Sequence, residues 1–102
     1  MNRRLDVFSS SQAMVLDAYY AETFVIVLRG NITRIKVKNV VPGRLYVFIV
    51  KMDSTGGHTI NWGAQMIDAS SVYLRSGSVS VFCFVGSTGG YLRANAPGTW
   101  QR

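Results

Sequence analysis

Residues 23–31 of the chain read TFVIVLRGN, and this stretch decides the fold class. Its first six residues are β-branched, aromatic or aliphatic, which is typical of a β-strand. The RGN triplet ends the run, because glycine and asparagine tolerate the positive φ of a tight turn. Residues 32–40 then alternate, with Ile35 and Val37 on one face, which predicts a half-buried return strand with its other side in water.

Outward from this stretch, short strand patterns recur, whereas apolar residues almost never repeat at the spacing of a helix. Residues 45–52 are apolar at nearly every position. This predicts a central strand covered by the facing sheet on one side and by a loop or another subunit on the other. The other predicted strands are residues 5–8, 58–62, 72–75, 79–85 and 91–94. The sequence therefore predicts an all-β protein, a β-sandwich of jelly-roll type with about seven or eight short antiparallel strands.

Two parts of the chain are expected. Residues 1–15 are predicted to be a short N-terminal arm and edge segment, and residues 16–102 the sandwich domain. The pattern of residues 12–20 fits either a helical turn or two or an edge strand, and residues 63–71 are expected to be a loop that crosses between sheets. With 102 residues, of which 48% are hydrophobic, the chain can bury one ordinary core.

The composition excludes several classes of protein. One cysteine cannot close an internal disulfide, and together with one histidine it cannot supply the ligands of an intrachain zinc site. The apolar runs fall far short of the roughly 20 residues that span a bilayer, and no apolar segment follows the N-terminal charges. We therefore expect no membrane partner, no secretory signal, no metal and no cofactor.

Eleven Lys and Arg against five Asp and Glu give a net charge of +6, which favours a negative partner such as nucleic acid, an acidic protein lattice or an anionic glycan. Alternation places three cations on one face of the strand after the RGN turn. These three, with two cations of the N-terminal arm, are the predicted partner contacts: Arg34, Lys36 and Lys38, and Arg3 and Arg4. The same stripe could simply keep that face wet. Since no aromatic residue alternates with the stripe, specific nucleic-acid recognition is not expected, and contact with phosphate is left open.

Five aromatic residues lie near strand ends or in connections and are the predicted interface aromatics: Tyr19, Tyr20, Trp62, Tyr91 and Trp100. Aromatic residues in such places bury area at protein interfaces, stack on sugar rings, or close the ends of a core. The sequence leaves these three roles open.

The chain offers little for catalysis. His58 could meet Asp53 across a turn, but no nucleophile or oxyanion site accompanies them. Cys83 lies inside an apolar run, where a cysteine acts as a small hydrophobic residue. The sequence therefore predicts a protein that is not an enzyme.

Four segments carry a resemblance: LDA at residues 16–18, TFVIVLRGNIT at 23–33, VPGRLY at 41–46 and KMDSTGGHTINW at 51–62. With the late hairpin, they resemble a β-sandwich domain of tailed-bacteriophage structural proteins that occurs in head-decoration and tail-fibre proteins. The resemblance covers about residues 16–94 and consists of turn signatures. The chain departs from the family pattern in two turns, at residues 63–66, where the family has a proline-bearing loop, and at residues 86–87, where it has an Asp-Gly turn.

The resemblance implies a non-enzymatic virion component, assembled in the host cytoplasm as a homotrimer. We expect a capsid decoration or cement protein that stabilises the head shell by binding the major capsid protein lattice, because 102 residues leave room for a short arm and not for a fibre shaft. One alternative is a tail-fibre or receptor-binding module that recognises a host surface glycan. A second is a basic nucleic-acid-binding β-protein.

Overall fold

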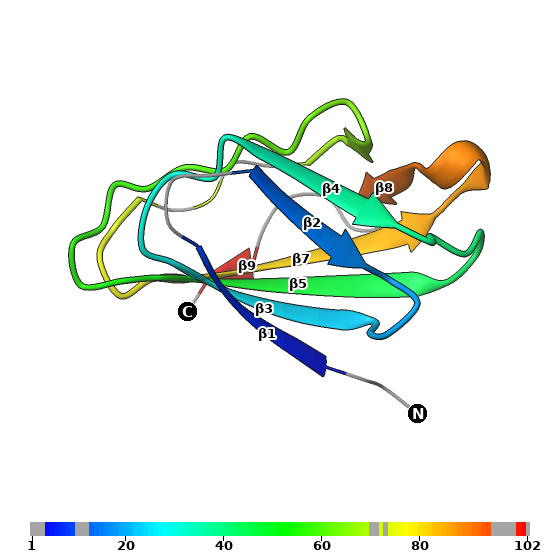
Figure 1. The fold of residues 1–102 in the computed structure, drawn as a ribbon. Helices are drawn as coiled ribbons and strands as arrows, with labels where there is room; N and C mark the ends of the chain where they lie inside the picture. The colour runs from blue at the N-terminus through cyan, green and yellow to red at the C-terminus, as the bar shows by residue number, and fades with distance from the viewer. Residues whose placement is uncertain (1–3, 10–12, 70–71, 73, 95–99, 102) are drawn as a thin grey trace.

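The computed structural model describes residues 4–9, 13–69, 72, 74–94 and 100–101, and the described chain is built of strands with one short 3₁₀ turn (Figure 1). The strands are β1 (Arg4–Ser9), β2 (Ala13–Asp17), β3 (Thr23–Leu28), β4 (Arg34–Lys38), β5 (Leu45–Met52), β6 (Met66–Ile67), β7 (Val79–Gly86), β8 (Leu92–Ala94) and β9 (Trp100–Gln101). The 3₁₀ turn, η1, spans Thr88–Gly90. The prediction of an all-β fold is confirmed.

The strands form two sheets, and the first five strands alternate between them. The main sheet has the order β1-β3-β5-β7-β8-β6, with β9 also paired to β7, while β2 and β4 form the small sheet. β1, β3 and β5 are parallel to one another, and so are β2 and β4. The chain therefore winds as a coil, adding one strand to each sheet per turn (Figure 1).

The prediction of antiparallel strands is correct only in part. β7 pairs antiparallel with β5, β8 and β9, whereas the pairs β1–β3, β3–β5, β2–β4 and β6–β8 are parallel. The strand after the RGN turn does not return beside β3 but crosses to the small sheet. The physical reason is that alternation reports which face of a strand is buried and not which strand pairs with it.

The two sheets enclose a core rich in aromatic rings. Phe48 lies at its centre, stacked on Phe24 at 5.0 Å between ring centroids and edge-on to Phe84 at 5.5 Å. Trp62 packs edge-on against Phe48 at 5.8 Å and Phe82 at 5.0 Å. Because Trp62 is only 7% exposed, its prediction as an interface aromatic is wrong, and the indole belongs to the core.

Two predicted strands are absent from the described residues. Residues 58–62 contribute one isolated bridge, Ile32–Ile60, and the described part of 72–75 contains no strand. Conversely, β2 occupies the ambiguous stretch at 12–20, and β6 lies within the predicted crossing loop. β1 lies at the edge of the main sheet, within the segment predicted as an arm and edge segment.

Candidate functional site

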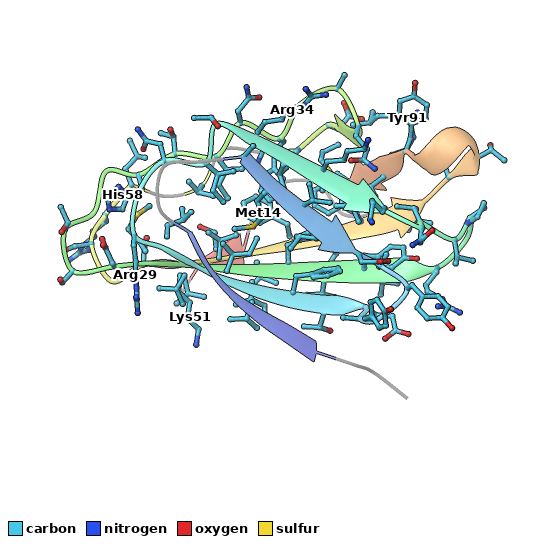
Figure 2. The ribbon with its side chains drawn as sticks, viewed as in Figure 1. Met14, Arg29, Arg34, Lys51, His58 and Tyr91 are labelled. Atoms are coloured by element: carbon cyan, nitrogen blue, oxygen red, sulfur yellow. The ribbon has the colours of Figure 1, made fainter. Side chains whose placement is uncertain are left out.

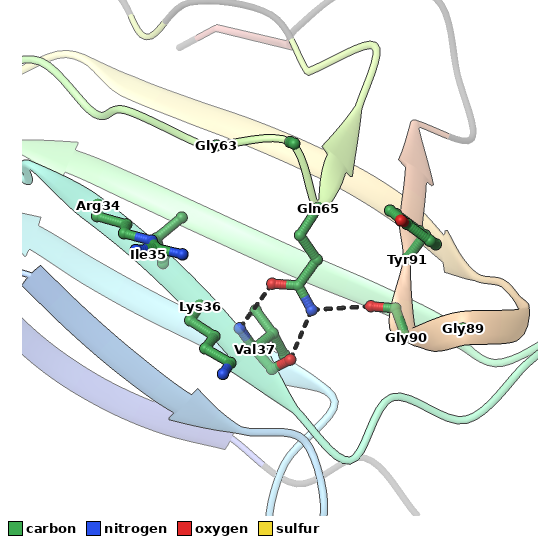
Figure 3. Close-up of a pocket in the computed structure, with 10 residues that line it drawn as sticks. Arg34, Ile35, Lys36, Val37, Gly63, Gln65, Gly89, Gly90 and Tyr91 are labelled. Atoms are coloured by element: carbon green, nitrogen blue, oxygen red, sulfur yellow. Dashed lines mark hydrogen bonds between the residues drawn. The ribbon is translucent and has the colours of Figure 1, made fainter.

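A hollow of about 420 Å³ lies beside β4, on the side away from β2 (Figure 3). Three segments that are distant in the sequence meet around it. Its lining consists of Arg34, Ile35, Lys36 and Val37 of β4, Gly63, Ala64 and Gln65 of the crossing segment, and Gly89, Gly90 and Tyr91 at the end of η1. A hollow of this size is within the range of small-molecule sites.

Gln65 holds these three segments together. Its Oε1 accepts a hydrogen bond from the Val37 N–H at 2.9 Å, and its Nε2 donates to the Val37 carbonyl oxygen at 2.6 Å. The same Nε2 donates to the Gly90 carbonyl oxygen at 2.8 Å (Figure 3). One side-chain amide thus satisfies both polar groups of a strand residue and ties η1 to β4.

The open edge of β4 is interrupted rather than continuous. Just before β4 begins, Ile32 donates to the Thr59 carbonyl oxygen at 2.8 Å and accepts from the Asn61 N–H at 3.0 Å. At its end, Gln65 covers Val37. Between these points the chain at residues 62–64 leaves the edge, so that the Ile35 peptide faces the hollow.

The orientation of the Ile35 peptide follows from strand alternation. The Lys38 carbonyl oxygen accepts a hydrogen bond from Ala18, on the β2 side, whereas both groups of Val37 point to Gln65. Ile35 has the same parity as Val37, so its N–H and C=O also point away from β2. A Cβ added to Gly63 would lie 4.0 Å from the Ile35 oxygen, which places that oxygen beside the crossing segment.

The predicted cationic stripe lies on one exposed face of β4, as expected. Arg34 and Lys36 line the hollow, and Lys38 does not. Lys38 lies instead near Asp17, whose pKa is held below its usual value by the Asn39 side chain, by the Tyr19 N–H and by the charge of Lys38. Arg34 and Lys36 thus lie at the hollow, whereas Lys38 lies near a carboxylate outside it.

The other predicted partner contacts are placed less fully. Arg3 lies outside the described residues, and Arg4 begins β1, with its side chain outside the described part of the structure. Trp100 begins β9, and its side chain is likewise outside that part.

Three predicted interface aromatics are exposed. Tyr19 and Tyr20 lie in the β2–β3 connection, are 65% and 64% exposed, and form an edge-to-face pair with centroids 5.1 Å apart. Tyr91 is 47% exposed at the rim of the hollow, where it follows the two glycines of η1 (Figure 2). Only Tyr91 is therefore combined with the cationic stripe.

His58 meets Asp53, as the sequence predicts. Its Nε2 lies 3.0 Å from Asp53 Oδ1, which also accepts hydrogen bonds from the backbone of Thr55 at 3.0 Å and Gly56 at 3.1 Å. Burial raises the pKa of the Asp53 carboxyl, but these hydrogen bonds and the charge of His58 outweigh it and hold the pKa below its usual value. The carboxylate thus organises a turn.

A second surface lies on the outside of the main sheet. β2 and β4 lie over one face of this sheet, and Figure 1 shows no described element over the other. We call that other side the outer face; its half-buried apolar members are Val27, Val47, Ile49, Val79, Val81, Cys83 and Val85. Cys83 is therefore a surface-facing thiol on an apolar sheet and not a core residue, which corrects its predicted placement.

Sequence reasoning missed Gln65 and the glycines of the hollow. Gln65 lies in a stretch without periodicity, and nothing in the sequence signals that its amide reaches Val37. In the described part of the chain, no three His, Cys, Asp or Glu side chains group as a metal site. No helix there has the length and apolarity needed to cross a bilayer.

Comparison of the chain with protein-family models, with curated proteins and with solved structures finds no match.

Proposed function

We propose that the chain is a non-enzymatic structural subunit that assembles with copies of itself through the outer face of the main sheet. The observation that carries this proposal is the composition of that face. In cross-strand rows, Ile49 stands between Val25 and Val81, and Val47 stands beside Cys83. Val25 is buried, whereas the other four side chains are half-buried and meet water in part in a monomer.

The outer face is mostly apolar, like a sheet face that is buried in a core. Its central rows are apolar, and two described charges lie at strand ends on this face: Lys51 at the end of β5 and Arg93 of β8, opposite Val85. Antiparallel and mixed sheets with a wet face normally alternate apolar and polar residues. A contiguous apolar patch of this kind usually marks a protein–protein interface.

The area of the outer face indicates how much of a protein–protein interface it can supply. The three strands β3, β5 and β7, about 20–26 Å long and spaced about 4.8 Å apart, give a flat area on the order of 350 Å². A standard interface takes about 800 Å² from each partner, so the face supplies somewhat less than half of one partner's share. A symmetric assembly in which neighbouring elements add the remainder fits this area, and a homotrimer is the form we propose.

For the assembly itself we propose a capsid decoration or cement protein in a bacteriophage virion. The turn signatures described above support this class, and the exposed stripe of Arg34, Lys36 and Lys38 supports docking on a negatively charged capsid lattice. The parallel pairing of the first five strands supports a short solenoid-like coil for the subunit in place of the jelly-roll connectivity.

The oligomer can be tested through a single atom. Cys83 is the only cysteine and lies on the outer face, so its reaction with a thiol reagent reports whether that face is covered. We expect light scattering to show a trimer for the wild-type protein and a monomer for the Ile49→Asp variant. The Cys83 thiol should react slowly in the wild-type protein and fast in the variant. Val15→Asp is the matched control, because Val15 is 60% exposed on the small sheet.

A wild-type monomer of 11.3 kDa at micromolar concentration, with a fast thiol, contradicts the oligomer. The virion role needs a separate test, in which the protein is sedimented with undecorated capsids and, separately, with host cells. Binding to capsids that weakens as salt shortens the Debye length below about 10 Å supports the decoration role. Binding to cells and not to capsids contradicts it.

A further inference from the structure

The interrupted edge of β4 is too short to accept another strand. At one end, the backbone of residues 59 and 61 forms hydrogen bonds with Ile32, and at the other end Gln65 covers Val37. Peptide binding by strand addition relies on a run of main-chain hydrogen bonds along an open edge. Only the N–H and C=O of Ile35 are presented here, so a peptide in strand form does not fit the gap.

The protein itself shows what kind of group satisfies one such residue. At Val37, two residues along the same edge, a single amide accepts from the N–H and donates to the C=O. A ligand that occupies the Ile35 position needs an acceptor and a donor close together, as the oxygen and nitrogen of this amide are. Neighbouring hydroxyl groups of a sugar ring supply this pair, since each hydroxyl both donates and accepts.

The rim of the hollow carries two positive charges and an aromatic ring. Arg34 and Lys36 are exposed beside the gap, and within the described residues neither forms an ion pair with a carboxylate. Guanidinium and ammonium groups favour a carboxylate. Tyr91 offers a half-exposed aromatic face, and Gly63 and Gly90 leave the opposite walls without side chains (Figure 3).

We propose that this hollow binds a pyranose that carries a carboxylate, such as a uronic acid. Two neighbouring ring hydroxyls bond to the Ile35 peptide, the carboxylate lies between Arg34 and Lys36, and the sugar ring packs on Tyr91. The site is formed within one chain, so it does not depend on the proposed oligomer.

An NMR titration tests the site residue by residue. Methyl glucuronide is added to the labelled protein, and methyl glucoside, which lacks the carboxylate, serves as the matched neutral sugar. We expect the glucuronide to shift the amide signals of Ile35, Gly63 and Gly90 in a saturable way, and the glucoside to bind about tenfold more weakly, the equivalent of one charge-assisted hydrogen bond.

Variants separate the site from general attraction to a basic protein. The double change Arg34→Gln and Lys36→Gln is expected to weaken glucuronide binding by about tenfold or more. Tyr91→Leu is expected to weaken both sugars. Lys38→Gln is the matched control, because Lys38 lies on the same face of β4 and outside the hollow, and it is expected to leave binding unchanged.

Three outcomes overturn the proposal. The first is the absence of a saturable shift at Ile35 with the glucuronide. The second is equal binding of glucuronide and glucoside that the double variant does not change. The third is the same set of shifts with N-acetylglutamate, which carries a carboxylate and no sugar ring and would assign the hollow to acidic peptides or to carboxylates in general.

Discussion

The side-chain amide of Gln65 stands in for a neighbouring strand beside Val37, with hydrogen bonds of 2.9 and 2.6 Å to the two sides of one peptide residue. A third bond, to Gly90, ties η1 to the same amide. The shape of the hollow therefore depends on one side chain in a segment with little regular structure.

Replacing Gln65 by Met is expected to destabilise the fold by about 1–3 kcal/mol, because three partly buried backbone groups lose their partner. Gln65→Glu keeps an acceptor for the Val37 N–H but places a carboxylate against two carbonyl oxygens. Its carboxyl pKa is therefore raised on folding, and the variant should regain stability as pH falls. Urea unfolding at two pH values measures both effects. Equal stability of Gln65→Met and wild type contradicts the role given to this amide.

Gly86→Ala is expected to be severely destabilising, by about 3 kcal/mol or more. The added Cβ would lie 2.8 Å from Val40 Cγ1 and would collide with the Val41 backbone. Gly43→Ala is the matched control, since it has φ +84° and no atom within 4 Å, and should cost only about 1–2 kcal/mol for its backbone conformation. Thermal unfolding of the two variants ranks them, and a smaller loss for Gly86→Ala contradicts the close approach.

Acid is expected to weaken the fold through two carboxylates. The pKa values of Asp53 and Asp17 are held below the usual 3.8, so their stabilising contribution is present above that value and is lost as pH falls through the lowered pKa values. The double variant Asp17→Asn and Asp53→Asn should show a flatter loss of stability below pH 3.8. Denaturant unfolding at several pH values in this range measures the loss of stability. If the variant loses stability with falling pH as steeply as the wild type, the role given to these two carboxylates is contradicted.

The aromatic residues divide into core and surface, and truncation should separate them. Trp62→Ala is expected to cost about 3–5 kcal/mol, because it removes a ring that packs on Phe48 and Phe82. Tyr20→Ala should cost less than about 1 kcal/mol, since this ring is 64% exposed. Calorimetry compares the two. Similar losses would mean that the exposed tyrosine has packing that the described contacts lack.

The strands β3 and β5 could be predicted to the residue, because each is an unbroken apolar run ended by turn formers. Their pairing could not. Apolar alternation fixes the buried face of a strand, whereas the choice between a hairpin and a crossing depends on long-range packing. The sequence therefore predicts that the β3–β4 connection reverses the chain within one sheet, whereas the chain crosses to the other sheet.

The sequence predicts only some of the residues of the candidate site. Alternation alone placed Arg34 and Lys36 on one face, and Tyr91 could be selected as an aromatic at a strand end. Gln65 and the Ile35 edge could not be found, because both depend on the crossing segment leaving β4 and returning to it. Trp62 was misplaced because a tryptophan at a strand end satisfies a core and an interface equally well in a sequence.

The winding of the first five strands bears on the speed of folding. Each parallel pair joins residues roughly twenty positions apart, with a strand of the other sheet in between, so no pair can form by local zipping. Among the described strands, only β7 and β8 are neighbours joined by a short loop. Many loops must close before the core gains its contacts, and refolding is therefore expected on the millisecond-to-second scale of proteins dominated by distant pairings.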